Sequence, residues 1–451
     1  MRQLLVGLEK KITKNQKMRM KFADTPERFM ESEVELHEEL QELFAVAASP
    51  ELYPVLVQSG AVGSLLGLLT HENTDVSLTV ISLLHEMIDA DGISDELDNA
   101  LEFINQFVDQ QGLELLVQNL YRLNEDSDED AQGVHDTLSI LEAMVDLIPQ
   151  QVAVPICEKT HILKFLLDRC RAKAFDANKL SCSELLSILL QADPTNQTLL
   201  CGLQGVDGMD SLLQCIAVYR KRDVTALDEQ VGRHDTTRQL EMSSSVTLSL
   251  FLSLSPSFIT TRPSQECVEN LFLCLCAVLQ TRENQFKFLA CEGFELLARC
   301  LKEDKYAAGC VVHALSYAVS KNRAGCEKLV DVGGLKYVFP LLTSSGVKRA
   351  LRSKHLKKRA GREKSSLEDS ALSIVAQLCS QLCSSSVNDY SARILYKFME
   401  RDSQKLDRCV DLFAKNCRVL DLTDEQIEET RRRLEQVQRR GYALRYPAMV
   451  C

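Results

Sequence analysis

The feature that most constrains the fold is a short pattern that recurs along the chain. A glycine or another turn residue is followed at once by a leucine-rich segment with helical spacing. Copies of the pattern start at Gly60, Gly112, His161, Gly208, Gly293 and Gly334. In the first copy, apolar side chains from Val62 to Leu69 fall at i, i+3, i+4 and i+7, which places them on one face of a helix.

A second helix is predicted after the polar turn at 71–74, because another apolar stripe runs from Val76 to Ile88. A hairpin of two such helices cannot bury both apolar faces alone, so it needs a copy of itself alongside. Successive starts of the pattern lie 52, 49, 47, 85 and 41 residues apart. Four of these steps are close to the ~40–47 residues of armadillo and HEAT repeats. The sequence therefore predicts an all-α, armadillo/HEAT-like α-solenoid with stacked pairs of helices.

The step of 85 residues is explained by an insertion at 231–265. This segment contains Ser243–Pro256, an uncharged run that alternates like a strand. Removing its 35 residues leaves a step of 85 − 35 = 50, which restores the period. We interpret 231–265 as a poorly ordered loop outside the solenoid, in preference to a strand-adding or membrane-touching segment.

The remaining boundaries follow from pattern and charge. Residues 1–48 are predicted to form an N-terminal helical cap, since end repeats need one polar face. Lysines and arginines between Lys10 and Lys21 give this cap a basic face, which we interpret as solvated surface rather than a nucleic-acid contact. The other predicted parts are repeats at 49–230, repeats at 266–440 with a basic loop at 347–364, and a non-helical tail at 441–451.

Composition excludes several classes of protein. No run of about eighteen apolar residues is present, so we expect no membrane span, and the first 21 residues do not form a secretory signal. The 17 cysteines show no paired spacing typical of zinc sites, and we predict mostly buried free thiols.

The motifs of common catalytic sites are missing. The sequence has no phosphate-binding GxxxxGK[ST], no GxSxG and no HExxH. Gly202, Gly205 and Gly208 are spaced GxxGxxG, but no strand pattern precedes them. The acidic segment, defined as Asn124–Asp130, lacks the spaced ligands of an EF-hand loop. We therefore predict no catalytic residue, no cofactor and no metal.

Charge is the remaining signal. Between His71 and Gln150, nineteen Asp and Glu oppose one Arg, giving 1 − 19 = −18 where the whole chain carries −12. Such a surface attracts basic peptides and repels nucleic-acid phosphates. On the concave face expected of a solenoid, we predict docking of basic partner segments in this stretch. The candidate residues are Asp75, Glu86, Asp89, Asp91, Glu125, Asp126, Asp128, Glu129, Asp130, Asp136 and Glu142.

Several long strings resemble the beta-catenin-like protein 1 family of armadillo-repeat, spliceosome-associated nuclear proteins. They lie at 22–33, 64–69, 73–77, 115–120, 133–135, 175–180, 182–184, 269–272 and 396–398. The resemblance covers roughly 1–440 apart from 231–265. It implies a nuclear α-solenoid that scaffolds pre-mRNA splicing in a nineteen-type complex. It also implies docking of basic nuclear-localisation-type segments of a Myb-like splicing factor and of a cytidine deaminase.

Three departures from that family are expected. The family has no counterpart of 231–265. Its basic N-terminal extension would precede Met1, and it continues with about a hundred further helical residues beyond Gly441. A different C-terminal section would leave an apolar helix face exposed there, and the oligomeric state, including a homo-oligomer, stays open.

Two other functions are weighed against the scaffold. Nuclear transport adaptors clamp lysine stems with tryptophans, and this chain has none. Direct RNA binding through 348–364 is disfavoured, because no aromatic side chains interleave the basic ones. The same run is a candidate nuclear-import signal, with Lys348, Arg349, Lys357, Lys358 and Arg359 as its core.

Overall fold

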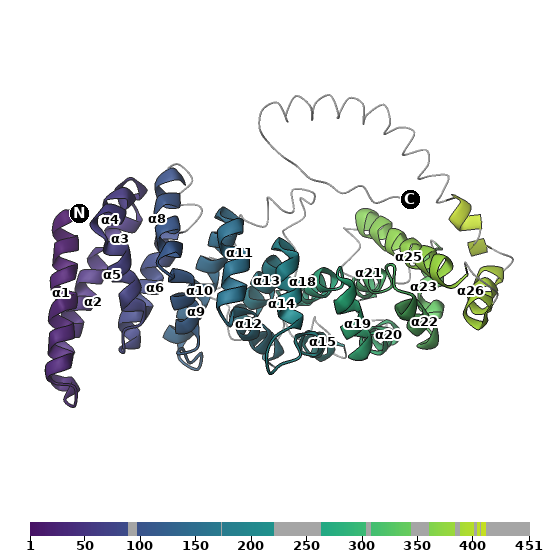
Figure 1. The fold of residues 1–451 in the computed structure, drawn as a ribbon, viewed down its shortest axis with the longest axis horizontal. Coiled ribbons are helices and arrows are strands. Elements are labelled where there is room, and N and C mark those ends of the chain that lie inside the picture. The colour runs from purple at the N-terminus through teal and green to yellow at the C-terminus, as the bar shows by residue number, and fades with distance from the viewer. Residues whose placement is uncertain are drawn as a thin grey trace, which may run out of the picture. The chain divides into compact units, whose positions relative to one another are not determined.

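The computed structural model describes residues 1–88, 97–172, 174–220, 263–303, 308–343, 360–383, 388–400, 404–405 and 407–411. Over these ranges the regular structure is helical throughout and contains no strand (Figure 1). This confirms the predicted all-α fold. The chain divides into two compact units, Met1–Ala318 and Val319–Cys451, each of which is described by itself below.

The N-terminal cap is helical, as predicted for 1–48. Its elements are α1 (Arg2–Lys21), η1 (Pro26–Arg28), α2 (Met30–Glu42) and α3 (Phe44–Ala47), followed by η2 (Pro50–Leu52). Helices α1 and α2 pack against each other and open the first unit (Figure 1). Pro26 is the first residue of the 3-10 turn, a position where the N–H group that proline lacks would have no hydrogen-bond partner within the turn.

The rest of the first unit consists of successive helix triplets rather than the predicted pairs. The triplets are α4 (Tyr53–Ser59), α5 (Ala61–Leu69) and α6 (Thr74–Ile88); α8 (Leu97–Asp109), α9 (Gly112–Leu120) and α10 (Asp128–Leu147); α11 (Pro149–Lys159), α12 (Ile162–Arg171) and α13 (Ala177–Ala192); α14 (Pro194–Cys201), α15 (Gly208–Tyr219) and α18 (Pro263–Val278); α19 (Arg282–Ala290), α20 (Gly293–Glu303) and α21 (Ala308–Ala318). The prediction of helix pairs was wrong, because the recurring pattern marks only the second helix of each triplet. The first helix ends just before the pattern begins and was not recognised as a separate helix.

The recurring glycine starts the second helix of a triplet, and packing explains why it is glycine. A Cβ atom on Gly112 would lie 2.3 Å from the ring of Phe107, which sits on the preceding helix. The same arrangement recurs at Gly293, where a Cβ atom would lie 2.2 Å from the ring of Phe288. A buried phenylalanine therefore occupies the space of the missing side chain, and it sets the turn between the first two helices.

The third helices of the triplets pack side by side in the order α6, α10, α13, α18 and α21 (Figure 1). Leucines, valines and isoleucines on these helices are almost wholly buried and form a continuous core. Buried asparagines join neighbouring triplets. Asn196 Nδ2 donates to the carbonyls of Leu189 and Ala153 at 2.8 Å each, and Asn284 Nδ2 donates to Val278 O at 3.1 Å and Gln197 O at 3.3 Å. The carbonyls of Leu189 and Val278 lie in the last turns of α13 and α18, where a helix leaves carbonyls without an intrahelical donor.

The C-terminal boundary predicted for the insertion 231–265 lies too far along the chain. Helix α18 already begins at Pro263, so residues 263–265 are helical rather than part of a loop. Residues 221–262, which include the strand-like run Ser243–Pro256, lie outside the described residues.

The second unit contains α22 (Arg323–Asp331), α23 (Leu335–Leu341), α25 (Ala360–Leu382) and α26 (Asp389–Met399). Helix α25 starts inside the predicted basic loop 347–364, so the last part of that stretch is helical. The candidate import residues Lys348, Arg349, Lys357, Lys358 and Arg359 lie outside the described residues, as does the predicted tail 441–451.

The cysteines of the described ranges are free, and most are buried, as predicted. Burial raises the pKa of the Cys276 thiol to about 12, which disfavours the reactive thiolate. Within the same ranges, no three His, Cys, Asp or Glu side chains are placed to hold a metal ion. No single described helix has both the length and the apolar character of a membrane span. The segments Pro50–Ser59 and Ala61–Leu69 have that length and apolar character only when taken together, and they are bent by 86° where they meet.

Candidate partner-binding surface

The predicted acidic residues do not form one patch. Asp89 and Asp91 lie outside the described residues. The acidic segment precedes and starts α10, whereas Glu142 lies near the other end of that helix. At about 1.5 Å per residue, Asp128 and Glu142 are about 21 Å apart along the helix axis. Asp75 and Glu86 are similarly exposed at opposite ends of α6.

The acidic segment serves to start helix α10. Ser127 is the N-cap, and its hydroxyl accepts from the backbone N–H of Asp130 at 3.4 Å. The carboxylates of Asp128, Glu129 and Asp130 fill the first turn, where the helix dipole favours negative charge. The Asp130 carboxylate also accepts from the backbone N–H of Asn124 at 2.7 Å and closes the loop. Within the segment, Asp126 and Asp128 make no such side-chain bond and are exposed.

Glu125 is committed to an internal ion cluster. Its carboxylate accepts from Arg169 Nε at 2.7 Å and Arg169 Nη2 at 3.0 Å, and from Asn178 Nδ2 at 2.9 Å. Arg169 Nη2 also donates to Asp176 Oδ1 at 2.6 Å, and Asp176 is the N-cap of α13. Glu125 therefore joins the loop before α10 to α12 and α13, and its charge is already neutralised.

Asp136 is also structural. It is only 4% exposed, and its carboxylate accepts from Ser82 Oγ at 3.0 Å and Gln132 Nε2 at 2.7 Å. The bond to Ser82 links α10 to α6. A side chain this deep in a helix interface cannot contact a peptide on the surface.

A different set of carboxylates comes together on three adjacent third helices. Glu142 and Asp146 lie on α10, Glu184 on α13 and Glu266 on α18, and we call these four residues the carboxylate quartet. Each of these helices packs against the next. Glu142, Glu184 and Glu266 are half-buried and Asp146 is exposed, so the quartet borders on solvent.

Burial, and to a smaller extent neighbouring like charges, disfavours the charged forms of Glu142 and Glu184. Burial raises the pKa of Glu142 to about 7, and the charge of Asp146 adds to the shift. Burial raises the pKa of Glu184 to about 8, with further contributions from Glu142, Glu266 and Asp146. No ion pair of the described residues involves Glu142 or Glu184, and Glu142 Oε1 is buried without a hydrogen-bond partner. A cation placed here would favour the charged carboxylates and fill that vacant acceptor.

Comparison with known proteins gives the family. The family model described as catenin-beta-like, Arm-motif containing nuclear matches residues 1–231 and 246–445. The chain belongs to this catenin-beta-like family. Beta-catenin-like protein 1 of human and of mouse is 36% identical over 430 residues, which cover 95% of this chain and 67% of each relative. The homologue of Schizosaccharomyces pombe is 27% identical over 419 residues, covering 92% of this chain and 64% of that protein.

Among solved structures, two engineered proteins are similar to the chain. One aligns with a TM-score of 0.33 and 15% identity over 84% of this chain and 94% of its own. The other has a TM-score of 0.30 and 14% identity over 70% of this chain and 97% of its own.

The catenin-beta-like family is described as nuclear, which confirms the predicted nuclear localisation. It is a family of Arm-motif proteins and not a known enzyme family. The family match omits only 232–245 within its span, so the unmatched part is shorter than the predicted insertion 231–265.

Sequence reasoning found Glu142 but missed its three partners. Asp146 lies inside the acidic stretch, yet it was not singled out. Glu184 lies one repeat after Glu142, since 184 − 142 = 42 residues. Aligning the repeats on their third helices would have placed these two glutamates side by side. Glu266 is the first residue after the predicted insertion 231–265, and no charge pattern in the sequence singles it out.

Proposed function

We propose that this protein is a non-enzymatic nuclear scaffold that docks basic segments of partner proteins on the carboxylate quartet. The observation that carries the proposal is that four carboxylates from three helices lie close together. Two of these carboxylates, Glu142 and Glu184, have raised pKa values and no ion-pair partner among the described residues. A lysine or arginine side chain supplies the missing charge and donates the hydrogen bond that Glu142 Oε1 lacks. The residues of the acidic segment play the smaller part, because most of them stabilise the start of α10.

The family resemblance supplies the biological setting. We infer that the partners are splicing factors with nuclear-localisation-type basic segments, and a cytidine deaminase of the kind that the family is thought to bind. The scaffold would then hold such proteins within a nineteen-type pre-mRNA splicing complex. A role in splicing is a separate proposal from the docking site and needs its own test. Affinity purification of the protein from nuclear extract should recover splicing proteins rather than import receptors.

The docking site is tested with a labelled lysine-rich peptide and two matched variants. The first variant neutralises the quartet with Glu142→Gln, Asp146→Asn, Glu184→Gln and Glu266→Gln. The second removes the same number of charges from the acidic segment with Asp126→Asn, Asp128→Asn, Glu129→Gln and Asp130→Asn. Fluorescence anisotropy should show a loss of affinity of about tenfold or more for the first variant. The second variant should lose less than about threefold. A larger loss in the second variant, or equal losses, would reject the quartet as the docking site.

The raised pKa values provide an independent readout. A bound cation lowers the pKa values of Glu142 and Glu184, so peptide binding releases protons at neutral pH. The affinity of wild type should therefore rise from pH 6 to pH 9, while that of the quartet variant stays flat. Calorimetry in buffers of different ionisation enthalpy measures the released protons directly.

A further inference from the structure

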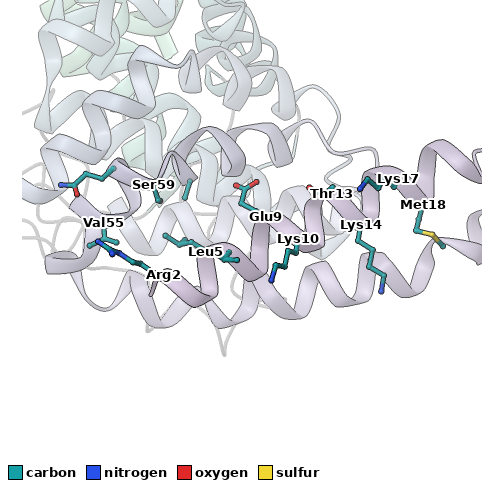
Figure 2. Close-up of a pocket in the computed structure, with 13 residues that line it drawn as sticks. Arg2, Leu5, Glu9, Lys10, Thr13, Lys14, Lys17, Met18, Val55 and Ser59 are labelled. Atoms are coloured by element: carbon teal, nitrogen blue, oxygen red, sulfur yellow. The ribbon is translucent and has the colours of Figure 1, made fainter.

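A second surface, of the opposite charge, lies on the first helix of the protein. A groove of about 1020 Å³ runs between α1 and the segment formed by α4 and the start of α5 (Figure 2). Most of its lining comes from one side of α1, and Val55 and Ser59 close the other side. The groove belongs to the first unit and shares no residue with the carboxylate quartet.

The base of the groove is apolar. Leu5 and Ala61 are 5% and 4% exposed and form its floor, and the half-buried Val55 and Met18 lie along its sides. Val6 is 52% exposed and, with Met20, is one of the two large hydrophobic side chains exposed on α1. Covering Val6, Val55 and Met18 would remove apolar surface from water, whereas Leu5 and Ala61 are already buried.

The rim of the groove is cationic. Arg2, Lys10, Lys14 and Lys17 oppose the single carboxylate of Glu9, which leaves 4 − 1 = +3 on a chain of net charge −12. Lys14 is bound to Glu35 on α2 at 2.7 Å, a carboxylate that it shares with Lys11.

The remaining charges of the rim are largely uncompensated. The Glu9 carboxylate accepts a hydrogen bond from the Ser64 hydroxyl on α5. Arg2, Lys10 and Lys17 have no ion-pair or hydrogen-bond partner among the described residues. These three side chains are exposed and are spread along the length of the groove.

The spacing of the lining residues gives the shape of the ligand. Arg2, Val6, Lys10, Lys14 and Lys17 recur every three or four residues along one face of α1. Figure 2 shows the four basic side chains of this set along the helix. From Arg2 to Lys17 this face is about 22 Å long, or about four helical turns. A partner helix of about fifteen residues lying along α1 would cover it.

We propose that this groove binds an acidic amphipathic helix of a partner protein. Its apolar side chains would pack on Leu5, Val6 and Val55, in the manner of helix-in-groove recognition. Its carboxylates would pair with Arg2, Lys10 and Lys17 at the rim. RNA is a poorer fit, since the lining has no aromatic side chain on which a base could stack and its floor offers nothing to a phosphate.

The proposal is tested on the full chain with a designed probe. The probe is a fluorescein-labelled peptide of about sixteen residues, with leucines at i, i+3, i+4 and i+7 and glutamates on both flanks of the leucine stripe. A scrambled peptide of the same composition is the control for amphipathic order. One groove variant carries Arg2→Glu, Lys10→Glu and Lys17→Glu, and a second carries Val6→Asp. A charge-matched control carries Lys21→Glu, Lys164→Glu and Lys302→Glu, all exposed outside the groove.

We expect the probe to bind wild type and the charge-matched control equally, and each groove variant at least tenfold more weakly. Equal binding of the scrambled peptide, or an unaffected Val6→Asp variant, would reduce the groove to a generic basic surface and overturn the proposal. Displacement of the probe by single-stranded RNA, with tighter RNA binding that the groove variants abolish, would overturn it in favour of RNA. Sedimentation that shifts from dimer to monomer in the groove variants would identify a second copy of the chain as the occupant.

Discussion

The acidic segment and the carboxylate quartet carry the same kind of charge, but the fold uses them differently. The acidic segment concentrates five carboxylates within seven residues, and all but Asp126 lie in the first turn of a helix, close a loop or pair with Arg169. The quartet draws carboxylates from positions as far apart as 142 and 266, and among the described residues no ion pair involves Glu142 or Glu184. Charge density along the sequence therefore does not show how much charge is available to a partner.

The strongest test of this comparison removes the cation that neutralises Glu125. Arg169→Met leaves Glu125 and Asp176 facing each other, partly buried and unpaired. We expect the free energy of unfolding to fall by about 3 kcal/mol, measured by urea denaturation followed by circular dichroism. Lys164→Met, at an exposed position on the same helix, serves as the control and should change stability little. Equal losses for the two variants would show that the ion cluster around Glu125 is not structural.

The second test concerns the quartet, where a substitution is expected to stabilise the protein rather than destabilise it. The pKa of Glu184 is raised in the folded state, so its stabilising contribution is present below the pKa of the unfolded chain, near 4.5, and is lost as pH rises through about 8. Glu184→Gln removes this loss. The variant should be more stable than wild type at pH 9, by on the order of 2 kcal/mol, and nearly equal to it at pH 4.5.

Thermal melts across this pH range measure the effect. Glu86→Gln is the matched control, because Glu86 is exposed on a third helix outside the quartet. A stability difference that does not depend on pH would contradict the assignment of a raised pKa to Glu184.

A smaller effect is expected at the start of α10. Ser127→Ala removes the side-chain acceptor for the Asp130 N–H and should cost about 1 kcal/mol. Faster hydrogen exchange of amides in the first turn of α10 would locate the loss. Ser139→Ala, in the middle of the same helix, should leave that turn protected.

The smallest effect is expected at Asp126. This residue is exposed, and its side chain makes no bond that stabilises the loop. Asp126→Asn should change stability by less than about 0.5 kcal/mol and peptide affinity by less than about twofold. A large loss of affinity would return the docking site to the acidic segment.

The fold could be predicted from the sequence because each repeat carries its own local signal. The apolar spacing after Gly60 and Gly112 fixes a helix start, and it recurs at the period of a helical repeat. The number of helices per repeat could not be predicted, since short first helices such as α4 and α14 contribute only one or two apolar turns. Periodicity over so few residues does not distinguish a separate helix from its neighbour.

The candidate site was harder to predict than the fold. Linear charge counts selected Glu125 and Asp136, whose partners Arg169 and Ser82 lie 44 and 54 residues away. Only tertiary structure shows that these carboxylates are already satisfied. The quartet itself depends on the register between α10, α13 and α18, and no local pattern reports that register.

The quartet is also assembled from three consecutive repeats, and this has an evolutionary consequence. Because each repeat of a solenoid contacts only its neighbours, a whole repeat can be added or removed while the others still fold. An extra unit inserted between α10 and α18 would separate Glu142 from Glu266 by a foreign helix, even though every triplet could still fold. Repeat number should therefore be invariant across this stretch in homologues that share the activity, while copies elsewhere in the array are free to come and go.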